Sequence, residues 1–100
     1  MATLLITSAG FQGRVIKLKL GTNRIGRAPD NDVQIEHPTI SATHCEIEVQ
    51  SDSLILCDCD STNGTFINRG KRLPKGTRQP LRDGDEIIVG KTFLRFHIVK

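Results

Sequence analysis

Apolar and polar residues alternate along much of the chain, which is the pattern of half-buried β-strands. The alternation is clearest in residues 14–20 and 45–49. No segment repeats its apolar residues with a helical period of about three to four. The expected strands occupy residues 2–7, 14–20, 24–27, 33–35, 45–49, 54–57, 66–67, 86–89 and 92–99. Many short strands with frequent turns predict an all-β sandwich or barrel.

Turn-forming residues separate these segments, and the richest cluster lies in residues 60–68. A second turn is expected at residues 21–23, where the sequence is Gly-Thr-Asn. The Asn-Gly pair inside the cluster is a strong turn signal, because both residue types accept positive φ. Apolar segments flank the cluster, so a rigid β scaffold is predicted to hold Ser61, Thr62 and Asn63 at its edge. Binding residues are often found at such positions.

Length and composition limit the architecture to one domain. The chain has 100 residues, of which 37% are hydrophobic, and this is enough for a single core. We expect one monomeric domain over residues 1–100, which can form part of a longer chain. No apolar run approaches the roughly 20 residues of a membrane span, and the first residues lack a signal-peptide pattern. The three cysteines suggest no disulfide framework, which favours a reducing cytoplasm.

Charge is distributed unevenly around a net value of +3. Up to residue 65 there are five basic and eight acidic residues, whereas the remainder has nine basic and three acidic residues. A basic surface attracts polyanions. However, the chain has no Trp or Tyr and only four Phe, which leaves little for stacking on bases. We therefore expect a solvated basic surface, with neither nucleic acid nor membrane as a partner.

Two residue clusters invite catalytic or metal-binding interpretations. Ser41, His44 and Asp60 are the residue types of a hydrolase triad, but the sequence shows no nucleophile elbow. Cys57 and Cys59 have only one residue between them, which is closer than the usual spacing of zinc ligands. We expect no catalytic residue, no metal site and no cofactor.

Several short motifs follow one another in a specific order. They are Gly26-Arg27, Asn31-Asp32, Ser41-x-x-His44, Ser61-Thr62-Asn63-Gly64-Thr65, Asn68, Gly84-Asp85 and Gly90. In this order and spacing, the chain resembles the forkhead-associated (FHA) domain family from about residue 21 to residue 98. The resemblance implies a SMAD/FHA-like β-sandwich of about eleven strands in two twisted sheets. It also implies a non-catalytic loop surface that binds phosphothreonine in a partner protein or peptide.

The resemblance assigns roles that agree with the chemistry of each side chain. Arg27 supplies a permanent cation that can donate two parallel hydrogen bonds to a phosphate. Ser41 and Thr62 supply hydroxyl donors, and Asn63 can both donate to and accept from a peptide backbone. The residues expected to support the site structurally are Gly26, Asn31, His44, Gly64 and Asn68.

Position 42 departs from the family pattern. Many members carry Arg, Lys or Asn directly after the matched serine, whereas this chain has Ala42. The loss of one charge-assisted hydrogen bond is worth about 1.5–3 kcal/mol. A second hypothesis therefore remains open, namely a phospho-independent protein–protein interaction domain with a degenerate phosphate site.

A basic segment follows the central motif. Arg69, Lys71 and Arg72 lie in or next to an expected hairpin turn. The family layout implies that this turn lies away from the phosphate-binding loops. We therefore expect all three side chains to form a solvated tip.

Overall fold

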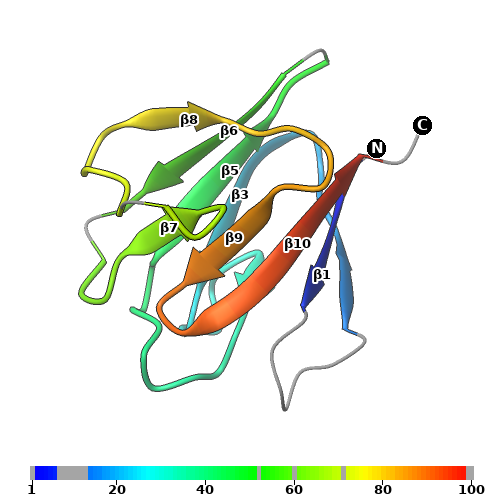
Figure 1. The fold of residues 1–100 in the computed structure, drawn as a ribbon. Coiled ribbons are helices and arrows are strands. Elements are labelled where there is room, and N and C mark those ends of the chain that lie inside the picture. Colours follow the sequence, from blue (N-terminus) through cyan, green and yellow to red (C-terminus); the bar gives the residue numbers. More distant parts are fainter. Residues whose placement is uncertain (1, 7–13, 52, 60, 71, 99–100) are drawn as a thin grey trace.

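The fold consists of two five-stranded β-sheets. Figure 1 shows how the strands are arranged in space. The computed structural model describes residues 2–6, 14–51, 53–59, 61–70 and 72–98, with only the backbone described for residues 2, 6 and 94–98. Its strand order is β2-β1-β10-β9-β7 in the first sheet and β4-β3-β5-β6-β8 in the second. All neighbouring strands pair antiparallel except β3 and β4, which are parallel. The predicted all-β sandwich is confirmed.

The described chain contains ten strands, close to the implied number of about eleven. Their bounds are β1 (Ala2–Ile6), β2 (Val15–Lys17), β3 (Gly21–Gly26), β4 (Val33–Gln34), β5 (Cys45–Val49), β6 (Leu54–Asp58), β7 (Thr65–Ile67), β8 (Arg78–Pro80), β9 (Glu86–Val89) and β10 (Thr92–Ile98).

The core lies between the two sheets and follows from the alternation along the strands. In β5, Cys45 and Ile47 are fully buried, while Glu46 and Glu48 alternate with them on the outer face. The buried apolar side chains come from both sheets and from the loops between them. They are Leu4, Leu18, Ile25, Val33, Ile35, Ile40, Cys45, Ile47, Leu56, Leu73, Leu81, Ile87 and Val89. No helix in the described part of the chain is long and apolar enough to cross a membrane.

The expected turn at residues 21–23 is wrong, because strand β3 already begins at Gly21. Gly21 is the first residue of the strand and has φ +94°, a backbone conformation that favours glycine. Asn23 is buried inside the strand, where its Nδ2 donates to the carbonyls of Lys19 and Ile47 at 2.9 and 3.2 Å. The Asn23 side chain therefore links β3 to the preceding residue Lys19 and to the neighbouring strand β5.

Two other strand expectations need correction. The alternation over residues 14–20 predicted a long strand, but β2 covers only Val15–Lys17 and Leu20 is 77% exposed. Strand β8 was missed because Pro80 interrupts the expected pattern. Its residues pair with β6 at the edge of the second sheet, a place where proline is tolerated.

Candidate functional site

Three loops meet at one end of the sandwich. They are residues 27–32 between β3 and β4, residues 35–44 between β4 and β5, and residues 61–64 before β7. Backbone hydrogen bonds join the first two, from Arg27 N to Ser41 O at 3.0 Å and from Ala28 N to Ala42 O at 3.2 Å. The third loop joins them through Thr62, whose backbone N–H donates to Ser41 Oγ, so the three loops form one continuous surface.

A concavity of about 140 Å³ opens on this surface. Its walls are formed by Arg27, Pro38, Thr39, Ile40, Ser41, Thr62 and Asn63. All four side chains that the sequence assigned to phosphate binding line it, although they come from three separate loops. The structure thus brings these predicted residues together.

One guanidinium nitrogen of Arg27, Nε, is hydrogen-bonded within the domain, and the two terminal nitrogens remain available as donors. Its Nε donates to the carbonyl of Ile40 at 3.0 Å, and Ile40 is anchored in the core. Within the described residues, the two terminal guanidinium nitrogens have no hydrogen-bond or ion-pair partner. They are therefore free to donate to an anion in the concavity.

Ser41 and Thr62 are joined through one hydrogen bond. The backbone N–H of Thr62 donates to Ser41 Oγ at 3.0 Å. Because Ser41 Oγ acts as the acceptor, its own hydroxyl hydrogen remains available to donate. The Thr62 side chain is exposed, and its hydroxyl has no partner in the described part of the chain. The pair thus offers two hydroxyl donors beside Arg27.

Asn63 is oriented by the loop opposite. Its Nδ2 donates to the carbonyl of Thr39 at 2.7 Å. Thr39 is held in turn by Lys91, whose backbone N–H donates to Thr39 Oγ1 at 3.1 Å. Asn63 therefore directs one donor inward, and its amide oxygen is left to accept a hydrogen bond from a peptide N–H.

His44 connects the loop of residues 35–44 to the loop of residues 61–64 through its imidazole ring. The side chain is fully buried. Its Nδ1 accepts from Ser41 N at 3.1 Å, so Nε2 carries the proton and donates to the Gly64 carbonyl at 2.8 Å. Burial lowers the pKa of His44, which keeps the imidazole neutral. The bond uses the backbone of Ser41 and not its hydroxyl, so this pair lacks the nucleophile–base contact of a triad. Asp60 lies outside the described residues.

Gly26 and Asn31 fix the distance between the first two loops. A Cβ at residue 26 would overlap the carbonyl oxygen of Ala42 and lie 2.8 Å from Asn31 Nδ2. That Nδ2 donates to the Ala42 carbonyl at 2.6 Å and to the Ala28 carbonyl at 2.8 Å. Only glycine allows this approach, which places the Arg27 loop against the Ser41 loop.

Asp58 organises the third loop, and sequence reasoning missed it. The carboxylate is 4% exposed. It accepts from Ser61 N at 3.0 Å, Ser61 Oγ at 2.5 Å and Thr65 Oγ1 at 2.6 Å. Burial alone would raise the pKa of Asp58, but these hydrogen bonds outweigh burial and lower it. A carboxylate three residues before a serine is a sequence signal for this contact, but the cysteines on either side of Asp58 are the only residues of this segment singled out from the sequence.

The turn after β7 lies away from the concavity. Asn68 was expected to support the site, but it lines a different hollow, with Arg82 and Asp85 among its neighbours. It has φ +51°, and its Nδ2 donates to Asp85 Oδ1 at 3.1 Å. Arg69 in the same turn pairs with Glu86 at 2.8 Å and lies 5.2 Å from the centre of the Phe93 ring. These contacts support the pairing of β7 with β9.

Arg72 corrects the expectation of a solvated basic tip. Its Nη2 donates to the Ser61 carbonyl at 2.5 Å. The side chain also lies against Gly64, where an added Cβ would be 2.7 Å from Arg72 Nε. An isolated antiparallel β-bridge pairs Arg72 with Phe66 of β7. The chain therefore runs back alongside β7, which places the Arg72 side chain next to Gly64. Lys71 lies outside the described residues.

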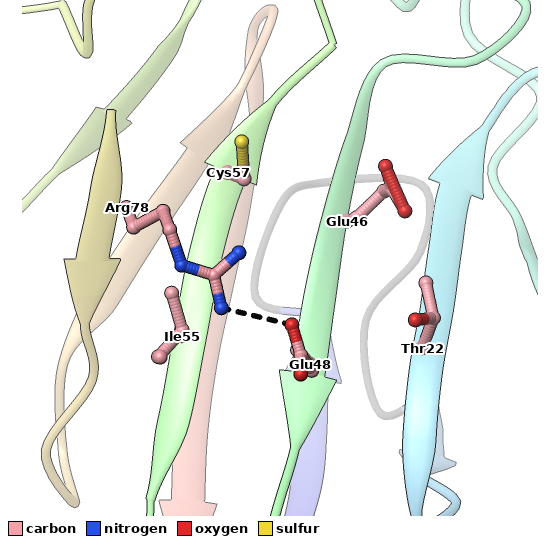
Figure 2. A pocket seen from close by; sticks show the side chains of 6 residues that line it. All are labelled: Thr22, Glu46, Glu48, Ile55, Cys57 and Arg78. Atoms are coloured by element: carbon pink, nitrogen blue, oxygen red, sulfur yellow. Dashed lines mark hydrogen bonds and ion pairs between the residues drawn. The ribbon is translucent and has the colours of Figure 1, made fainter. Parts of the chain in front are cut away.

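A second hollow lies on the outer face of the second sheet. Figure 2 shows its lining of Thr22, Glu46, Glu48, Ile55, Cys57 and Arg78. Arg78 Nη2 pairs with Glu48 Oε2 at 2.9 Å, and this hydrogen bond lowers the pKa of Glu48. The charges of Glu48 and Arg78 in this hollow therefore already pair with each other.

The cysteines are free thiols in the described chain. Burial raises the pKa of Cys45 well above its ordinary value. Burial and the hydrogen bond from Cys59 Sγ to Glu46 Oε1 raise the pKa of Cys59 to about 12. The described residues contain no cluster of three His, Cys, Asp or Glu side chains that could hold a metal ion.

Comparisons with known proteins agree with the family resemblance seen in the sequence motifs. The FHA domain family model matches residues 23–90, which confirms the resemblance seen in the motifs. The chain is 41% identical over 83 residues to human Mediator of DNA damage checkpoint protein 1, covering 80% of this chain and 4% of that protein. It is 33% identical over 95 residues to the Oxoglutarate dehydrogenase inhibitor of Corynebacterium efficiens, covering 95% of this chain and 64% of that protein. The chain thus spans less than two thirds of the length of either relative.

A similar solved structure is the N-terminal FHA domain of S. cerevisiae Rad53p, which was determined in complex with a phosphothreonine peptide. It superposes with a TM-score of 0.85 at 26% sequence identity, covering 98% of this chain and 93% of that chain.

Proposed function

This chain belongs to the FHA domain family, and we propose that it is a phosphopeptide-binding module. It recognises phosphothreonine in a partner protein, or in another part of its own host protein, and carries no catalysis. The observation that supports this proposal is the convergence of Arg27, Ser41, Thr62 and Asn63 on one concavity.

The concavity offers the groups that a phosphothreonine requires. A phosphate carries about −1.5 to −2 charge and three acceptor oxygens. The free nitrogens of the Arg27 guanidinium can donate to it in parallel. The hydroxyls of Ser41 and Thr62 add neutral donors, and the amide of Asn63 holds the peptide backbone beside the phosphorylated residue. Most of the binding free energy is thus expected to depend on the phosphate.

The proposal extends to the context of the domain. We take residues 1–100 as one monomeric domain acting in the cytoplasm, which can form part of a longer chain. Three free thiols support a reducing compartment. The small share of the checkpoint relative that this chain covers supports a modular role.

A titration by fluorescence polarisation tests the proposal. Degenerate peptide libraries containing phosphothreonine, phosphoserine or unmodified threonine are compared under the same conditions. We expect binding to phosphothreonine, weaker binding to phosphoserine because the methyl group is missing, and none to threonine. Equal binding of all three libraries would refute the proposal.

Two variants test the assigned residues. Arg27→Ala and Asn63→Ala should each weaken phosphothreonine binding by about ten- to a hundredfold, the cost of losing a charge-assisted or clasping hydrogen bond. Both should leave the melting temperature nearly unchanged. Arg82→Ala is the matched control, because that exposed arginine lines the hollow around Asn68. A large drop in melting temperature for Arg27→Ala would instead identify a structural residue.

The second candidate function is a phospho-independent interaction domain with a degenerate phosphate site. Ala42 favours it, since a side chain often used for phosphate contact is missing. The hollow around Glu48 and Arg78 offers an alternative surface on the sheet. A pull-down with and without phosphatase treatment separates the two functions, because only the first loses its partner on dephosphorylation.

A further inference from the structure

Arg72 and Ser41 bind opposite ends of the same peptide group. The C=O of Ser61 accepts from Arg72 Nη2 at 2.5 Å, and the N–H of Thr62 donates to Ser41 Oγ at 3.0 Å. These two atoms belong to the single peptide unit between Ser61 and Thr62, which is trans because the described chain contains no cis bond. In a trans peptide the C=O and N–H point in opposite directions. Arg72 therefore lies behind the loop, on the side away from Ser41.

This arrangement forms a continuous chain of donors that ends at the concavity. It runs from the Arg72 guanidinium through the Ser61–Thr62 peptide to the Ser41 oxygen, whose own hydrogen is free to donate. Consecutive hydrogen bonds polarise one another in the low dielectric of a protein, and a cation at the start strengthens the effect. The Ser41 hydroxyl thereby becomes a better donor toward an anion.

Independent contacts fix Arg72 in this position. The side chain lies against Gly64, whose φ of +90° and close approach exclude a side chain there. The neighbouring groups of the turn have other partners, since Asp58 accepts from Ser61 N and His44 donates to the Gly64 carbonyl. Among the described residues, Arg72 is therefore the only hydrogen-bond donor to the Ser61 carbonyl. The positive charge of Arg72 also acts on His44, where it contributes to the lowered pKa of the imidazole.

We infer that Arg72 is a positioning residue for phosphate recognition, acting through the Ser61–Thr62 peptide group on the Ser41 hydroxyl. The inference rests on the proposed function. Arg72 polarises the Ser41 hydroxyl through the Ser61–Thr62 peptide group. This indirect effect replaces part of the direct attraction to the phosphate that a cation at position 42 would provide. The ligand class remains a peptide bearing a phosphate dianion.

A double-mutant cycle with Arg72→Met and Ser41→Ala tests the inference. Affinity for the best phosphothreonine peptide of the library is measured by fluorescence polarisation for wild type, both single variants and the double variant. Arg72→Met should weaken binding about three- to tenfold, the size of one partly screened interaction with a doubly charged group. In the Ser41→Ala background the same change should cost clearly less, because the chain of donors is already interrupted. Arg82→Met, which removes an exposed charge elsewhere, should leave the affinity unchanged.

Nuclear magnetic resonance of the free protein gives a second readout. The amide proton of Thr62 should move upfield in Arg72→Met, since its hydrogen bond to Ser41 weakens. Arg72→Lys keeps the charge without the planar fork and should recover part of both the shift and the affinity. If Arg72→Met does not fold, the cycle is run with Arg72→Lys, which should then show a smaller coupling of the same sign.

The outcomes separate the inference from the proposed function. Absence of phosphate-dependent binding by the wild type would refute the proposed function and the inference with it. Normal wild-type binding, with equal losses for the Arg72 variant in both Ser41 backgrounds or with no loss at all, would refute the inference and leave the proposed function intact.

Discussion

Replacing His44 by alanine should be among the most destabilising single changes in this domain. The imidazole is fully buried and forms two hydrogen bonds, from Ser41 N to Nδ1 and from Nε2 to the Gly64 carbonyl. Each buried group left without a partner costs about 1–3 kcal/mol. The vacated space adds a cavity cost, which entering water reduces. We expect a loss of about 3–5 kcal/mol in the free energy of unfolding, a large share of the roughly 5–15 kcal/mol typical of a domain.

Urea denaturation followed by circular dichroism measures this loss directly. His44→Gln is the matched control, because its amide can still donate to the Gly64 carbonyl while the acceptor for Ser41 N is lost. Its cost should be about half that of alanine. Both variants loosen the Ser41 and Gly64 loops, so phosphopeptide affinity should fall in the same order. A loss below about 1 kcal/mol for His44→Ala would refute the bridging role, since the burial and both hydrogen bonds would then contribute almost nothing.

The same histidine predicts a pH dependence with a definite sign. Burial lowers the pKa of His44 in the folded state below its ordinary value of 6.5. Between these two pKa values the unfolded chain binds a proton that the folded chain does not, so stability falls as pH decreases. The contribution is complete above the unfolded value and is lost progressively below it. Comparing unfolding free energies of wild type and His44→Gln at pH 7.5 and pH 5.5 (about one unit to either side of that value) isolates the effect. Parallel losses in the two proteins would contradict it.

Three further changes probe the loops. Ala42→Lys should tighten phosphopeptide binding about tenfold and steepen its salt dependence, as measured by fluorescence polarisation in increasing NaCl; unchanged affinity would mean that residue 42 does not reach the phosphate. Gly26→Ala should cost about 1–3 kcal/mol, because its Cβ would overlap the Ala42 carbonyl, and scanning calorimetry that found an unchanged melting temperature would disprove the close approach. Asp58→Asn should cost about 2–4 kcal/mol by removing the charged acceptor of Ser61 and Thr65, and urea denaturation showing equal stability would exclude this role.

Local sequence patterns predicted most of the fold correctly. The expected strand at residues 45–49 coincides with β5 (Cys45–Val49), since strict alternation with one apolar face admits a single register. The pattern failed at Asn23, a polar residue that turn statistics favour but that the structure buries in β3. It failed again at Pro80, because tolerance of proline depends on whether a strand lies at a sheet edge.

The sequence by itself determined the β architecture, and its motifs named four of the residues that line the concavity, Arg27, Ser41, Thr62 and Asn63. Alternation, turn chemistry and motif order are properties of neighbouring residues, so they can be recognised without coordinates. The motifs also named His44 as a supporting residue, but only the tertiary structure showed its contacts and added Asp58 and Arg72. Asp58, His44 and Arg72 act on the turn at residues 61–64 through contacts that depend on how the strands pair. Arg72 shows the reason most clearly: the sequence places it in a basic segment, and the bridge to Phe66 turns it back against the binding loop.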